Sequence, residues 1–158
     1  MSELDNLLRR YRVWNHHLEK VCNEIGANEL AFRPMPESNS AAWILLHIID
    51  GYREFIELSG PDRAEERLGK LPRPTESELV KMTFSKIFAL VEAHRDAFFQ
   101  DVERLSESER LGSICPAGEG KTWLDLIHTV TMHEIYHCGQ LAYLARVMQQ
   151  KAKESREE

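Results

Sequence analysis

The sequence lacks the features that mark several classes of protein. Its three cysteines are odd in number, widely spaced and without a C-x-x-C pair: Cys22, Cys115 and Cys138. A reducing cytoplasm fits this usage best, because proteins of oxidising compartments usually carry paired cysteines. The richest apolar run, Ala41 to Ile49, is short and interrupted by His47, and the chain does not open on a basic segment followed by an apolar core. We therefore expect neither a membrane span nor a signal peptide.

Basic residues are in the minority. The chain has 20 lysines and arginines against 26 aspartates and glutamates, a formal net charge of −6 at pH 7. A protein that neutralises phosphate groups normally carries a basic face, so we expect no nucleic-acid partner and no polybasic membrane contact. With 158 residues, 42% of them hydrophobic, the chain can bury one substantial core, and we expect a single domain over residues 1–158. Histidine stands out, with seven residues.

Apolar residues recur every three or four positions in four segments, the spacing of amphipathic helices that face a bundle. The expected helices cover residues 7–25, about 41–59, 75–105, and 121 or 122 to about 150. No segment alternates convincingly as a strand would, so the pattern predicts an all-α four-helix bundle. The three connections have about fifteen residues each, more than an up-down-up-down bundle needs, so we expect long crossover connections, of which one or more run from end to end of the bundle. The polar tail, residues 151–158, is expected to fray.

Short polar signals mark the expected helix ends. Gly26 follows the first apolar stripe, in the place that a C-terminal glycine usually takes, and Ser40 precedes the second helix as an N-cap. The segment Thr75-Glu-Ser-Glu has the spacing of a capping box and is expected to begin the third helix. Lys121 or Thr122 is expected to begin the last helix.

The last expected helix carries two histidines four residues apart, in His133-Glu-Ile-Tyr-His137. This spacing places both imidazoles on one face of the helix, about 6 Å apart along its axis. Such a pair can chelate a transition metal, but two ligands alone rarely hold an ion against water. A third donor is therefore needed from elsewhere in the chain.

His47 is the best candidate for the third donor. It interrupts an apolar run on a helix that must pack against its neighbours, and a buried imidazole needs a polar partner. His128 lies nine residues before His137, about 180° around a straight helix, so these two cannot bind one ion together. The remaining histidines are interpreted as core-edge or surface residues: His16, His17 and His94.

The same five residues also match H-E-x-x-H, in which Glu134 would be the general base of a zinc protease. The surrounding sequence argues against this interpretation. The longer metzincin pattern needs Gly and His where the chain has Gln140 and Tyr143. Only 21 residues follow His137, and the glutamates among them lie in the polar tail rather than on a separate packed helix. Glu134 is therefore interpreted as a solvated carboxylate or as one that orients a ligand.

Two segments, Ser40 to Asp50 and Trp123 to Gln140, together resemble the DinB/YfiT-like superfamily of metal-binding four-helix bundles. One histidine in the second helix, followed by H-x-x-x-H and x-G-Q in the last, is more telling than the pair alone. The resemblance covers most of the chain. It implies that the three metal ligands are His47, His133 and His137, that open positions remain for water or substrate, and that the protein forms a homodimer with a crossover connection. Members often carry Arg where this chain has Cys138, so we do not expect an anion-pairing role at that position.

The resemblance also narrows the chemistry. Three neutral imidazoles leave a bound ion its full charge, which lowers the pKa of bound water or of a bound thiol toward neutrality. Similar proteins include thiol-dependent transferases and isomerases, and others described as hydrolases. We therefore expect a cytoplasmic enzyme with nickel or zinc that transfers a low-molecular-weight thiol to a small electrophile. The alternatives are a metal-hydroxide hydrolase of the same fold, a non-enzymatic metal- or ligand-binding stress protein, and a metal-free bundle that binds partners.

Four further residues are expected in or beside the pocket: Trp43, Asp50, Glu134 and Gln140. Asp50 falls about one turn after His47 and Glu54 about two, where a carboxylate can accept the free ring N–H of a ligand; a polar helix face near Arg53 is the alternative. An indole one turn before His47 can form a pocket wall or simply belong to the core. The amide of Gln140 can bond a ligand or a neighbouring helix, and Cys138 is interpreted as a packing residue.

Overall fold

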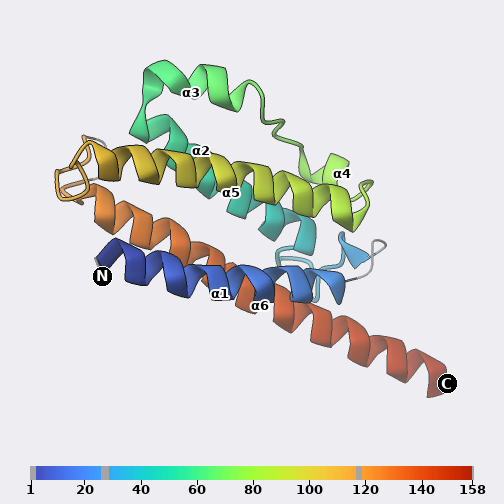
Figure 1. Cartoon of the computed structure of the whole chain (residues 1–158). Helices are drawn as coiled ribbons and strands as arrows, with labels where there is room; N and C mark the ends of the chain where they lie inside the picture. The colour runs from blue at the N-terminus through green and yellow to red at the C-terminus, as the bar shows by residue number, and fades with distance from the viewer. Residues whose placement is uncertain (1–2, 26–28, 117–118, 158) are drawn as a thin grey trace.

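The computed structural model describes residues 3–25, 29–116 and 119–157, and these form a bundle of helices (Figure 1). The four long helices are α1 (Glu3–Asn23), α2 (Ala41–Ser59), α5 (Phe84–Glu107) and α6 (Trp123–Glu157). Two short helices, α3 (Pro61–Leu68) and α4 (Glu76–Leu79), lie between α2 and α5 in the chain. The described residues contain no strand beyond one isolated bridge, so the all-α bundle predicted from periodicity is confirmed.

The long helices do not pack in chain order. α1 packs mainly on α6, while α2 packs on both α5 and α6. Figure 1 shows α2 and α5 running in the same direction, opposite to α1 and α6. The chain between α2 and α5 must therefore return along the length of the bundle, and it carries α3 and α4 on the way. The expected end-to-end crossover is present.

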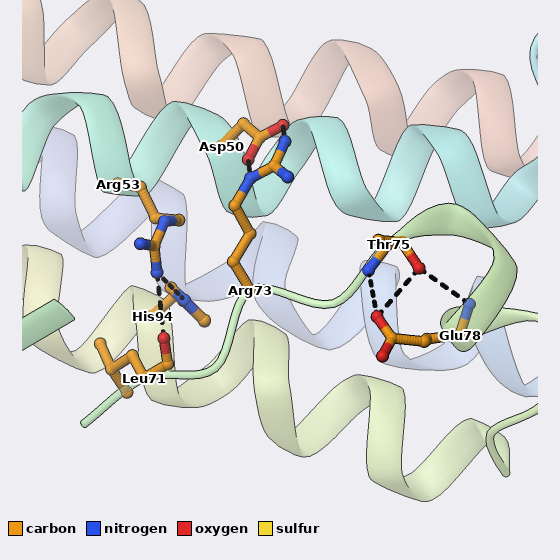
Figure 2. A network of polar contacts seen from close by, with 7 residues as sticks. All are labelled: Asp50, Arg53, Leu71, Arg73, Thr75, Glu78 and His94. Carbon is orange, nitrogen blue, oxygen red and sulfur yellow. Dashed lines mark hydrogen bonds and ion pairs between the residues drawn. The ribbon is translucent and has the colours of Figure 1, made fainter. Parts of the chain in front are cut away.

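Helix boundaries differ from the expectation in the third helix. The capping box of Thr75 and Glu78 forms, with Thr75 N donating to Glu78 Oε2 at 2.7 Å, but it begins only the one-turn α4 (Figure 2). A second N-cap, Thr83, takes an extended conformation and starts α5 at Phe84. Thr83 makes no side-chain capping hydrogen bond, so it is its extended backbone rather than a side-chain cap that separates the two helices.

Two other expectations about helix extent change. α3 is too polar to show an apolar stripe, although Pro61 at its first position and Gly69 after its end are usual helix boundaries. Residues 151–157 continue α6 rather than leaving the helix near 150, because lysine, alanine, glutamate and arginine are strong helix formers. α1 ends at Asn23, and the expected stop at Gly26 lies outside the described residues.

A buried carboxylate holds α3 against α5. Asp101 of α5 is 1% exposed and contacts the guanidinium groups of Arg67 and Arg104. Ser59, at the end of α2, donates its hydroxyl to Asp101 Oδ2 at 2.8 Å. These partners compensate the burial of the charge, and they fix the crossover where it leaves α2.

The core is formed by apolar stripes of the long helices, and α6 contributes one of them. Buried residues on α6 recur with alternating spacings of four and three: Ile127, Thr131, Glu134, Cys138, Leu141, Ala145 and Met148. This periodicity defines the face of α6 that points inward. His133 and His137 lie at the edge of that face, where α6 meets α2.

A closed ring of polar groups lies inside the bundle and draws one residue from each long helix. Arg95 of α5 donates from Nη2 to Glu134 Oε1 of α6 at 2.7 Å, and these residues are 5% and 3% exposed. Tyr11 of α1 donates its hydroxyl to Glu134 Oε2 and lies 2.5 Å from the hydroxyl of Tyr52 on α2. Arg95 Nε completes the ring by donating to Tyr52 at 3.4 Å. We call these four residues the buried polar network.

Removing one charge of this network should be costly. Arg95→Met leaves the Glu134 carboxylate buried without its cation, and we expect a loss of about 3–5 kcal/mol in the free energy of unfolding, measured by urea denaturation. The double variant Arg95→Met/Glu134→Leu should lose less than Arg95→Met alone, because no charge remains buried.

Arg146→Met is the matched control, since Arg146 is an exposed arginine of α6, and its unfolding free energy should stay close to that of the wild type. Equal unfolding free energies of Arg95→Met and this control would contradict the claim that Glu134 needs its buried cation.

Candidate metal centre

The two helices that carry the histidines of interest have well-defined starts. Ser40 caps α2 by accepting a hydrogen bond from Trp43 N at 3.0 Å, which places His47 two turns into the helix. At the start of α6, Asp125 N donates to Thr122 Oγ1 at 3.1 Å and Thr122 N donates to Asp125 Oδ2 at 2.9 Å. Of the two expected starting residues, Thr122 is therefore the N-cap.

The structure brings together the three histidines that the sequence singled out. His133 Nε2 lies 3.0 Å from His47 Nε2 and 3.0 Å from His137 Nε2. Ligand atoms of all three lie within 4.8 Å of one another. Zinc–nitrogen bonds of about 2.0–2.1 Å in a tetrahedral site separate ligand nitrogens by about 3.3 Å. The three imidazoles are therefore close to the separation that one shared ion would give.

Several contacts orient these imidazoles. His137 Nδ1 donates to Gln140 Oε1 at 2.7 Å, which leaves Nε2 as the nitrogen with a free lone pair. Trp43 stacks on His47 one turn along α2, with ring centroids 4.8 Å apart. Gly51 makes room for His133, because a Cβ at this position would lie 3.2 Å from His133 Nδ1.

The histidines are electrostatically suited to bind a cation. Burial, with the neighbouring imidazoles, lowers the pKa of His133 to about 4. Burial also lowers the pKa of His137, against the opposing effect of its bond to Gln140. Neutral imidazoles expose the nitrogen lone pairs that a metal needs. The donor set of three imidazoles suits zinc, nickel, copper or iron, so the residues fit a divalent transition metal.

Asp50 and Glu54 do not orient the histidines. Asp50 forms a two-pronged ion pair with Arg73, which donates from Nε at 2.6 Å and from Nη2 at 2.8 Å (Figure 2). Arg73 lies on the crossover between α3 and α4. The Asp50 carboxylate therefore holds this segment against α2 and does not bind a ligand imidazole. The side chain of Glu54 is exposed.

Glu134 is neither solvated nor directed at a ligand. It is almost fully buried in the polar network, paired with Arg95 and Tyr11. The reason is its direction on α6, about 100° from His133, which points it to the interior when His133 points to α2. Burial raises the pKa of Glu134 to about 7, and the hydrogen bond from Tyr11 acts in the opposite direction.

The remaining histidines have ordinary partners or exposed positions. His94 is buried, donates from Nδ1 to Leu90 O at 2.8 Å, and has Nε2 3.4 Å from Arg53 Nη1 (Figure 2). His128 has a half-exposed side chain 3.8 Å from Glu3. His16 is exposed beside Glu19.

The expected packing role of Cys138 agrees with its burial. Burial also raises the pKa of the Cys138 thiol, which makes it a poor nucleophile.

Two grooves flank the histidines along the line where α2 meets α6. The first, of about 490 Å³, lies between residues 34–44 and residues 136–144. We call it the tyrosine groove, after Tyr136 and Tyr143 on its α6 wall. The second, of about 270 Å³, follows His47 on α2 and precedes His133 on α6. We call it the charged groove, because Glu54, Glu119 and Lys121 line it.

Comparison with known proteins assigns the chain to a family. A family model described as the DinB superfamily matches residues 10–141, a range that includes all three clustered histidines. The chain belongs to the DinB superfamily. Searches of curated proteins and of solved structures found no match. None of the described helices of this DinB-superfamily chain is long and apolar enough to cross a membrane.

The buried polar network and the tyrosine groove were not predicted from the sequence. The buried polar network had a visible signal: Arg95 interrupts the stripe of Val91, Phe98 and Val102 on α5, and a charge on such a stripe needs a buried partner. The tyrosine groove had none, because the segment 34–39 reads only as a loop until it lies against α6.

The three histidines should bind one divalent ion per chain. After equilibration with zinc or nickel and removal of unbound ions, elemental analysis should find the ion in wild-type protein, and neither His47→Ala nor His133→Ala should retain it. His128→Ala is the matched control, because it removes a histidine of α6 outside the cluster. Equal metal content in all four proteins would contradict the site.

Gln140 should tune metal affinity without supplying a ligand. Gln140→Leu removes the acceptor that holds His137, and we expect zinc affinity to fall by about ten- to a hundredfold in competition titrations with a chelating indicator. Gln149→Leu, an exposed position on the same helix, should leave the affinity unchanged. An unchanged affinity in Gln140→Leu would show that this bond does not orient the imidazole.

Proposed function

We propose that this protein is a metal-dependent enzyme that uses a nickel or zinc ion to transfer a low-molecular-weight thiol to a small electrophile. The observation that carries the proposal is the convergence of three imidazole nitrogens on one point, with a groove on either side. A bound ion with an open position would lower the pKa of a thiol and make the thiolate available at neutral pH.

The two grooves favour transfer between two substrates over hydrolysis. A hydrolase needs a pocket for one substrate beside water, whereas a transferase must place two molecules next to each other. The lining of the charged groove precedes the histidines on α6 and that of the tyrosine groove follows them, so each substrate would have its own approach. In the reaction, the thiol sulfur bonds to the electrophilic carbon, the leaving group departs with its bonding electron pair, and the thiol proton leaves with it.

The chain's own residues would position the reactants. His47, His133 and His137 would hold the ion, and Gln140 keeps the His137 ring in the orientation that presents Nε2. Trp43, stacked on His47, restricts that ring and covers one of its faces. Reactants held beside the ion in the two grooves would lose less freedom of movement on reaching the transition state.

A cytoplasmic homodimer is part of the proposal. Cys22, Cys115 and Cys138 are all free and buried, which supports a reducing compartment. Membership of the DinB superfamily supports the dimer through the resemblance set out above.

Turnover can be tested with a chromogenic electrophile. Protein loaded with zinc or nickel should accelerate the reaction of cellular thiols with 1-chloro-2,4-dinitrobenzene, and the acceleration should vanish on chelation and in His133→Ala. His128→Ala should react like the wild type. If protein with a verified ion catalyses no transfer for any thiol and electrophile pair, the proposal fails; product release without consumption of thiol would identify a hydrolase instead.

A further inference from the structure

The tyrosine groove lies beside the histidine centre, and two of its lining residues contact His137. Tyr136 packs its ring against His137, with centroids 5.1 Å apart, and Gln140 accepts a hydrogen bond from the same imidazole. Both residues also line the groove. A molecule in the groove would therefore extend to the side of the centre where His137 lies. The volume, about 490 Å³, is within the range of pockets that bind small molecules.

The tyrosine groove offers no charge to a ligand. Among the described residues that line it, none is acidic or basic, although 29% of the chain is charged. Its polar groups are neutral hydroxyls and amides, such as those of Ser38, Asn39 and Gln140. An ionised ligand would lose hydration here without gaining a counter-charge, so the groove discriminates against it. By contrast, acidic and basic side chains line the charged groove on the other side of the centre.

Two exposed aromatic rings stand on the α6 wall of the tyrosine groove. Tyr136 and Tyr143 are 64% and 63% exposed. They are seven residues apart, about two helical turns, so both stand on the same face of α6. Ile44 and Leu144 also line the groove, although they are only 2% and 4% exposed. Flat rings beside apolar side chains favour an aromatic ligand, which can stack on them while the tyrosine hydroxyls remain hydrated.

We propose that the tyrosine groove binds an uncharged aromatic molecule, and that this molecule is the electrophile of the transfer reaction. The second part rests on the proposed function, whereas the binding itself does not. The electrophile's carbon gains the sulfur as its leaving group departs with the bonding electrons and the thiol proton. The charged groove is then left for the thiol, whose ionic groups would find partners there.

Two fluorescent dyes that differ in one sulfonate group test the binding without metal. N-phenyl-1-naphthylamine is neutral and 1-anilinonaphthalene-8-sulfonate is its anionic analogue. In titrations of the metal-free, full-length protein, we expect the neutral dye to bind about tenfold more tightly than the anionic one.

Variants place the bound dye in the groove. Tyr143→Ala should weaken binding of the neutral dye by about tenfold, whereas Tyr143→Phe, which keeps the ring, should retain it. Trp14→Ala removes an exposed aromatic side chain of α1 and should leave the affinity unchanged. Equal affinity for the two dyes, or equal affinity of wild type and Tyr143→Ala, would overturn the assignment.

Binding in the tyrosine groove and metal-dependent thiol transfer can be tested separately. In metal-loaded protein, Tyr143→Ala should raise KM for 1-chloro-2,4-dinitrobenzene with zinc content unchanged. Dye binding that depends on Tyr143, in a protein without metal or turnover, would refute the proposed function and support the groove. Metal-dependent turnover with no effect of Tyr143→Ala on KM or on dye binding would overturn the groove assignment alone.

Discussion

The rotation of α6 about its own axis is the constraint on which the metal centre depends. Glu134 reaches Arg95 and Tyr11 only when it faces the interior of the bundle, and its neighbour His133 then faces α2. A buried ion pair adds little net stability compared with apolar residues of similar size. Its main consequence is that only one rotation of α6 leaves no charge buried without a partner. The same rotation brings His133 and His137 to His47.

Contacts between α2 and α6, and within each of these helices, position the three histidines. Gly51 allows His133 to approach α2, Trp43 restricts His47, and Gln140 fixes the tautomer of His137. The two grooves lie before and after the histidines along the line where α2 meets α6. A bundle with α2 and α6 as antiparallel neighbours thus places three histidines that could hold a metal ion between two grooves (Figure 1).

Local sequence signals predicted the parts of the structure that local physics controls. Apolar periodicity predicted the four long helices, and Ser40 caps α2 as expected. The capping box at Thr75 formed but begins α4 rather than the long α5, and Thr122, one of the two expected starting residues, caps α6. The division of the third helix was not predicted, because the apolar stripe continues across Thr83, where the backbone becomes extended without a side-chain cap hydrogen bond.

Long-range pairs were beyond local signals. Asp50 pairs with Arg73 of the crossover, and Glu134 pairs with Arg95 of α5; both choices depend on which helices become neighbours. Spacing on one helix gave the pair His133 and His137, while His47 was singled out by its apolar surroundings and the family resemblance. That the three lie together required the packing of α2 on α6.

X-ray absorption spectroscopy of zinc-loaded protein can show whether the three histidines form a metal centre with an open position. We expect three imidazole ligands at about 2.0–2.1 Å and one further light ligand, which a sulfur at about 2.3 Å should replace when a low-molecular-weight thiol is added. A spectrum with fewer than three imidazoles, or a zinc ion saturated by protein ligands and unchanged by thiol, would contradict an open three-histidine centre formed by His47, His133 and His137.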